Sequence, residues 1–129
     1  MTRLLLVFVG GGLGAMARYG VGVASMRVLG PGATWPWGTF AVNLLGGLAM
    51  GLLAGWLAHR GGADQERWRL LIGVGVLGGF TTFSAFSLEA ALMVERRAWG
   101  QAAAYAAASV VLSVGALFVG LYLARRAFA

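Results

Sequence analysis

The chain has 129 residues, of which 60% are hydrophobic and only 11% are charged, and its mean hydropathy is +0.81. A soluble domain has more charge and less apolar content, so this composition indicates an integral membrane protein. The net charge of +6 comes from ten arginines scattered between apolar runs, which argues against nucleic-acid binding, and the lack of cysteine excludes disulfides and thiolate metal sites.

Four apolar runs are long enough to cross a bilayer, for which about 20 residues are needed. They cover residues 4–26, 39–58, 70–94 and 101–123, and short joins between them hold most of the charges and turn formers. All five tryptophans lie at or beside a run end, where an indole prefers the headgroup level. The sequence therefore predicts one all-α domain, residues 1–129, with four transmembrane helices in a cell inner or plasma membrane.

The first run has some features of a signal peptide, including a possible cleavage site at Ala15-Met16-Ala17. However, the apolar stretch continues past that site, and Arg18 follows it directly. Small residues at four-residue spacing let helices approach closely in lipid. Because Arg18 shares a face with such residues, we expect it to point into protein or a water-filled vestibule. This face consists of Gly10, Gly14, Arg18 and Gly22.

The second run carries Asn43 one turn from its start and a glycine face formed by Gly47, Gly51 and Gly55. An amide side chain in hydrocarbon needs a hydrogen-bond partner. Two interpretations of Asn43 stay open, namely an interhelical bond that stabilises the fold and a direct role in function.

The third run contains the most informative segment, GGFTTFSAFS over residues 78–87. Paired glycines and β-branched threonines at mid-span are poor helix formers, and a helix break here would free backbone groups. Such groups are tolerated where they line water or bind an ion, and freed carbonyls suit Na⁺. The alternative is an unbroken helix whose Thr and Ser side chains bond back to the preceding turn.

Two aromatic side chains follow in the same run. Phe83 and Phe86 share a helix face, and the positive edge of an aromatic ring can attract an anion weakly. Ordinary lipid or core packing is the competing interpretation. Glu89 is the only acidic residue well inside a run, which makes it a functional candidate.

The fourth run places hydroxyls on one face, at Tyr105, Ser109 and Ser113. A row of hydroxyl donors could replace the hydration shell of a small anion in steps. Alternatively, each hydroxyl bonds a carbonyl of its own helix, and the spacing does not decide between the two.

The arrangement of charge and the small size of the bundle suggest an oligomer. Six arginines fall on one side of the predicted helices and four on the other, a weak bias that permits insertion both ways up. Four short helices also enclose little interior, so a water-filled ion pathway needs further helices to line it. We therefore expect at least a dimer.

Three segments together resemble those of one known family. They are Gly11–Tyr19, Gly38–Gly46 and Gly78–Glu89, and the fourth run matches mainly through its Tyr and Ser positions. Order and spacing resemble the bacterial fluoride channel family (Fluc, also called CrcB) along the whole chain. That family usually has Thr where this chain has Ala85, so one hydroxyl is missing.

The resemblance implies an antiparallel dual-topology homodimer, with the third helix broken near its middle and two fluoride pores along the interface. It also implies a structural Na⁺ at the centre, held by main-chain carbonyls of Gly78 and Thr81 in both subunits. The expected pore and anion-binding residues are Asn43, Phe83, Phe86, Tyr105, Ser109, Ser113, Thr82, Ser84, Glu89 and Arg18.

The function implied is a passive channel and not an enzyme, through which F⁻ leaves the cell and its toxicity is lowered. The first rival is a small multidrug-type dual-topology transporter, which needs a central carboxylate that the first run lacks. The second rival is a non-transporting membrane assembly subunit, which would not need a polar path.

Overall fold

The computed structural model describes residues 1–60 and 62–128, and every regular element in that part of the chain is a helix. Four helical segments are long and apolar enough to span a membrane, which confirms the predicted all-α multi-pass fold. Each segment extends beyond its apolar run, because interfacial Trp, Arg and small residues continue the helix. The segments are α1 (Thr2–Leu29), α2 (Trp37–His59), a composite third segment (Gln65–Glu95) and α6 (Trp99–Phe128).

The third segment changes its backbone geometry along its length. Its parts are α3 (Gln65–Trp68), the π-helical stretch η1 (Arg69–Leu77), α4 (Gly78–Phe80) and α5 (Phe83–Glu95). Between α4 and α5, Thr81 and Thr82 are extended, with φ/ψ of −85°/159° and −152°/124°. The predicted break is therefore confirmed and the unbroken helix is wrong. The glycine pair itself stays helical, and the two threonines form the break.

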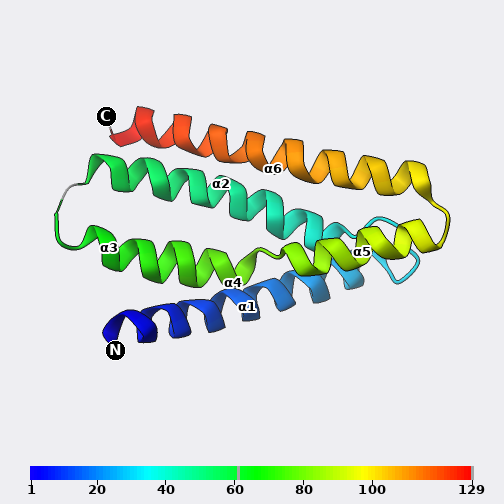
Figure 1. Cartoon of the computed structure of the whole chain (residues 1–129), viewed down its shortest axis with the longest axis horizontal. Coiled ribbons are helices and arrows are strands. Elements are labelled where there is room, and N and C mark those ends of the chain that lie inside the picture. Colours follow the sequence, from blue (N-terminus) through cyan, green and yellow to red (C-terminus); the bar gives the residue numbers. More distant parts are fainter. Residues whose placement is uncertain (61, 129) are drawn as a thin grey trace.

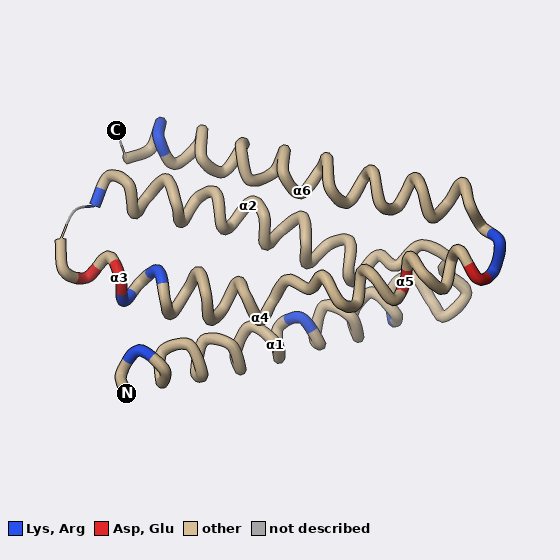
Figure 2. Tube along the Cα trace, viewed as in Figure 1, with Lys and Arg blue, Asp and Glu red and all other residues tan. Residues whose placement is uncertain are grey.

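The helices are arranged as two pairs (Figure 1). α2 packs along α6, and α1 packs along η1 and α4. Both chain ends and the join between α2 and α3 lie at one end of the bundle, while the joins after α1 and α5 lie at the other. Charged residues gather mainly at these two ends, with exceptions on α1 and α5 (Figure 2). This distribution fits a bundle whose apolar middle faces lipid.

Glycines allow both helix pairs to approach at backbone distance. On α2, a Cβ at Gly51 would collide with the Leu117 carbonyl of α6. On α1, a Cβ at Gly14 would collide with the Val76 carbonyl of η1. The four-residue glycine spacing read from the sequence thus corresponds to close helix contacts. Gly22 is different, since a Cβ there would meet nothing within 4 Å.

The buried core is thin and lies in two clusters. Leu53, Leu57 and Leu77 form one, and Met93, Ala102 and Tyr105 form the other. Many large apolar side chains remain on the outside, among them Phe8 at 77% exposure. In water such a surface would drive aggregation, whereas hydrocarbon solvates it.

Candidate functional site

Asn43 of α2 holds the break in the third helix through two hydrogen bonds. Its Nδ2 donates to the Thr82 carbonyl at 3.0 Å, and the Thr82 N–H donates to its Oδ1 at 2.9 Å. One side-chain amide thus satisfies both backbone groups of a residue that has left the helix, as the membrane interior requires. The interhelical role left open for Asn43 is found here. One of its two N–H donors remains for another acceptor.

The break also redirects two backbone amides. In a continuous helix, the Gly78 carbonyl would accept from the Thr82 N–H, and the Thr81 carbonyl from the Ala85 N–H. Here the Thr82 N–H donates to Asn43 Oδ1 instead. Thr82 is the N-cap of α5, and its Oγ1 accepts from the Ala85 N–H at 3.2 Å. Gly78 and Thr81, the two expected Na⁺ ligands, are therefore among the carbonyls that lose their usual helical partners at the break.

Gly46 fixes how closely α2 approaches the break. A Cβ at this position would collide with the Thr81 methyl, Cγ2, and would lie 3.7 Å from Phe80 Cδ2. Thr81 is in turn held by its own hydroxyl, which donates to the Leu77 carbonyl at 2.9 Å. The next glycine, Gly47, lets α2 approach α6 closely, because a Cβ there would collide with the Ser113 carbonyl. Four-residue spacing does not single out Gly46, because the regular glycine face of α2 consists of Gly47, Gly51 and Gly55.

A hollow of about 410 Å³ lies beside the break. It brings together residues from α2, the break, α5 and α6, which lie far apart in the chain. Six of the expected pore residues line it, together with Thr81 and apolar side chains of α6 such as Val110 and Val114. The six are Asn43, Thr82, Phe83, Phe86, Ser109 and Ser113.

The hydroxyl row of α6 is buried without hydrogen-bond partners. Within residues 1–60 and 62–128, no hydrogen-bond partner is found for the hydroxyl oxygens of Tyr105, Ser109 and Ser113. Tyr105 is 0% exposed, so bulk solvent does not reach its hydroxyl. The alternative in which these hydroxyls bond carbonyls of their own helix is therefore not found. Buried donors without partners are costly in a protein interior, which suggests a ligand that accepts hydrogen bonds.

The two phenylalanines differ in environment. Phe83 is 78% exposed, whereas Phe86 is half-buried, and their ring centroids lie 5.6 Å apart. Phe86 also packs against the Tyr105 ring at 5.1 Å. Both residues line the hollow, and the positive edge of an aromatic ring can attract an anion.

The N-terminus of α5 adds a second positive feature beside the hollow. The helix begins at Phe83, in the middle of the membrane-spanning segment, and its first amide groups have no intrahelical partners. A helix N-terminus carries a partial positive charge that favours anions, more so in a medium of low dielectric constant. Thr82 caps one amide, and Thr82 and Ser84 share a hydroxyl contact of 3.3 Å.

The remaining expected residues lie away from this hollow. Glu89 lines a separate hollow of about 250 Å³ at the end of the bundle where α1 joins α2. Tyr105 lines neither hollow but is buried among aromatic rings between them. Arg18 is partly exposed on α1 and lines neither one. Ser84 is exposed beside the break.

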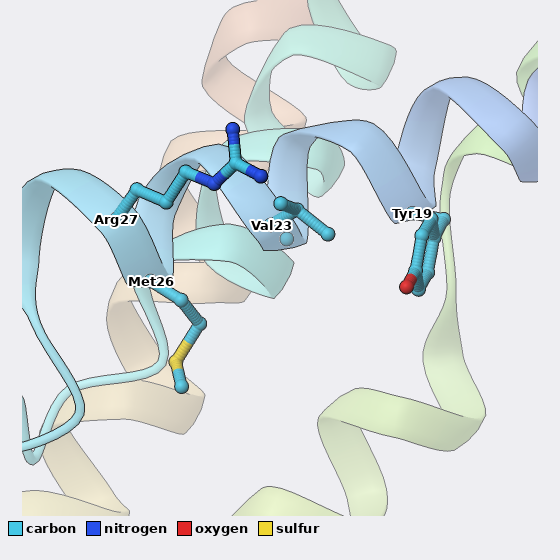
Figure 3. Close-up of a pocket in the computed structure, with 5 residues that line it drawn as sticks. Tyr19, Val23, Met26 and Arg27 are labelled. Carbon is cyan, nitrogen blue, oxygen red and sulfur yellow. The ribbon is translucent and has the colours of Figure 1, made fainter.

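Another hollow has no features of a site. It measures about 510 Å³ and is lined by α1 alone, mainly by Tyr19, Val23, Met26 and Arg27 (Figure 3). Tyr19 and Met26 are 75% and 57% exposed, so this is an open apolar surface. Such a surface on one helix fits contact with lipid.

Comparison with known proteins gives a family match over most of the chain. Residues 5–121 match the family described as "CrcB-like protein, Camphor Resistance (CrcB)". Among similar curated proteins, one from Phenylobacterium zucineum is 70% identical over 129 residues, which is all of both chains. One from Caulobacter sp. (strain K31) is 66% identical over 99% of this chain and 98% of the relative. Both relatives are named fluoride-specific ion channel FluC.

The contact between Gly46 and Thr81 predicts a specific rescue. G46A should lower the thermal unfolding midpoint in detergent, because overpacking at a tight contact costs about 1–3 kcal/mol. T81S removes the methyl that the new Cβ would meet and keeps the hydroxyl that bonds Leu77. The double variant G46A/T81S should therefore recover most of the lost stability.

G12A is the matched control, since a Cβ at Gly12 would meet nothing within 4 Å. Its midpoint should equal that of the wild type. The steric role of Gly46 is wrong if G46A is as stable as G12A, or if T81S gives no recovery.

Proposed function

The chain belongs to the CrcB-like family, and we propose that it acts as the fluoride-specific ion channel for which its close relatives are named. It passes F⁻ across the cell membrane without any covalent step, so it is not an enzyme. Fluoride enters a cell as the neutral weak acid and ionises inside. A passive pore then lets the ion leave down its electrochemical gradient, which lowers cytoplasmic fluoride.

The observation that carries this function is the set of unpartnered hydroxyls beside the break. F⁻ holds its water strongly, so a selective path must offer hydrogen-bond donors in a narrow space. Ser109 and Ser113 provide such donors, and Asn43 has one N–H left for the same hollow. Phe83 and Phe86 border the hollow with ring edges that attract an anion without holding it tightly.

An antiparallel homodimer completes the path in this proposal. In one chain the hollow is open at the side, and Phe83 is exposed at 78%. Polar groups beside such an opening would face hydrocarbon in a monomer, which is unfavourable. A second copy placed over this face would enclose them, and the split of six arginines against four permits both orientations. The dimer would lie in the bacterial inner membrane.

A structural Na⁺ fits the chemistry of the break. The Gly78 and Thr81 carbonyls have lost their usual helical partners, and carbonyl oxygens of an unwound membrane helix are suitable Na⁺ ligands. Two carbonyls from each subunit of a dimer would give four oxygens. The ion would neutralise the partial negative charge at the end of α4 and stabilise the extended backbone there.

The rival functions lack comparable support. A small multidrug-type transporter needs a carboxylate at the centre of its substrate site. Glu89, the one acid well inside a span, lies in the hollow at the end of the bundle. An assembly subunit gives no reason for buried donors without partners.

Fluoride efflux from liposomes tests the function directly. Liposomes loaded with fluoride and containing the wild-type chain should release it rapidly to a fluoride electrode, and equivalent chloride-loaded liposomes should not release chloride. F83I and F86I should each reduce fluoride efflux at least about tenfold, because an aliphatic side chain has no positive edge. Dimer content measured by size-exclusion should be unchanged, since each variant keeps an apolar side chain.

L121A, a change on α6 outside the hollow, serves as the control and should keep wild-type efflux. Wild-type liposomes that retain fluoride would refute the channel. Full efflux from F83I/F86I would remove both rings from the mechanism and leave them as packing groups.

The antiparallel arrangement predicts dual topology. A reporter fused after the C-terminus should be detected on both sides of the membrane when the chain is expressed alone. The reason is that neither orientation places a decisive excess of arginine inside. Detection on one side only, in cells that export fluoride, would contradict the antiparallel dimer.

A further inference from the structure

In residues 1–60 and 62–128, the buried side-chain polar atoms without a hydrogen-bond partner belong to residues that line one of two hollows or pack between them. In the part of the chain that the structure describes there are five, and three belong to the hydroxyl row of α6. The other two, Trp35 Nε1 and Glu89 Oε1, lie beyond Tyr105 on residues that line the 250 Å³ hollow at the end of the bundle. Native proteins rarely leave such atoms unpaired, so their alignment indicates a path for ligand or water.

Trp35 lies beside a span end, as the other tryptophans do, but its Nε1 is buried away from the surface. Its ring meets Tyr105 and Phe40 edge to face, at centroid distances of 5.3 and 5.5 Å. An indole N–H can only donate, so a ligand at this position must accept a hydrogen bond.

A continuous row of aromatic rings connects the two hollows. Phe86 borders the hollow beside the break, Tyr105 packs against Phe86 at 5.1 Å, and Trp35 packs against Tyr105 and borders the outer hollow. The outer hollow opens at the end of the bundle, where α1 joins α2. The rings of Tyr105 and Trp35 therefore lie in succession between the two hollows.

We propose that the Trp35 indole N–H is the outermost anion-binding donor of the path, at a mouth subsite where fluoride still keeps part of its water. This inference rests on the proposed fluoride-channel function. Glu89 lines the same hollow, and its carboxylate would repel a bare anion at close range. A water molecule that donates one hydrogen bond to Glu89 and another to the ion would separate the two, so the subsite takes a hydrated small anion.

The first test observes the indole directly. Uniformly ¹⁵N-labelled wild-type protein in detergent gives indole N–H resonances from five tryptophans, and W35F identifies the Trp35 resonance by its absence. Titration with sodium fluoride should move that resonance downfield to saturation, because the N–H acquires a charged acceptor. Sodium chloride at equal concentration should not move the Trp35 resonance. Sodium fluoride should not move the Trp99 resonance.

The second test measures flux against fluoride concentration. W35F keeps an aromatic ring for the contacts with Tyr105 and Phe40 but removes the donor. It should need about tenfold more fluoride for half-maximal efflux, with little change at saturation, because loss of a hydrogen bond to an ion weakens binding by about that factor. W99F, at an exposed tryptophan outside both hollows, is the matched control and should behave as the wild type.

The outcomes separate the two claims. A Trp35 resonance that does not respond to fluoride, in protein that transports it, would overturn the mouth subsite and leave the channel intact. Identical concentration curves for W35F and W99F would do the same. Absence of wild-type flux would instead overturn the channel itself, and the inference with it.

Discussion

The paired hydrogen bonds between the Asn43 amide and the Thr82 backbone are the interaction on which the rest of the structure depends. A helix cannot be interrupted in hydrocarbon unless its freed backbone groups find partners, since each unpaired group costs several kcal/mol. Asn43 supplies an acceptor and a donor at once, from a neighbouring helix. The break, the start of α5 and the hollow beside them follow from that one side chain.

The break gives the site two opposite electrostatic features within a short stretch of chain. α4 ends with carbonyls whose helical partners have been redirected, and α5 begins with amides that have no intrahelical partners. The first favours a cation and the second an anion. Gly46 lets α2 approach the Thr81 methyl of the break, and Gly47 lets it approach the Ser113 carbonyl of α6. The proposed fluoride path beside a structural Na⁺ would use both features.

The fold could be predicted largely from the sequence, because membrane spans require only length and hydropathy. The segment of the break was also predictable from the unusual GGFTT composition. Its exact place was not, since the freed backbone groups of Thr82 are satisfied by Asn43, which lies 39 residues away in the chain. The spacing of Tyr105, Ser109 and Ser113 predicted the hydroxyl face of α6. Whether these hydroxyls have hydrogen-bond partners depends on how the helices pack, which the spacing does not show. The environment of the Trp35 N–H could not be predicted for a similar reason, because run-end position indicates the headgroup level and says nothing of where the N–H points.

Substituted cysteines test the position of the path most directly, because the natural chain has no cysteine to interfere. Val110 lines the hollow beside the break, whereas its neighbour Val111 is 66% exposed and does not. With each variant in liposomes, fluoride efflux is measured before and after addition of Ag⁺, a small cation that binds thiolates. The account predicts that Ag⁺ blocks efflux through V110C and leaves V111C unchanged. An equal response of both variants would contradict it, because the ion would then not pass through this hollow.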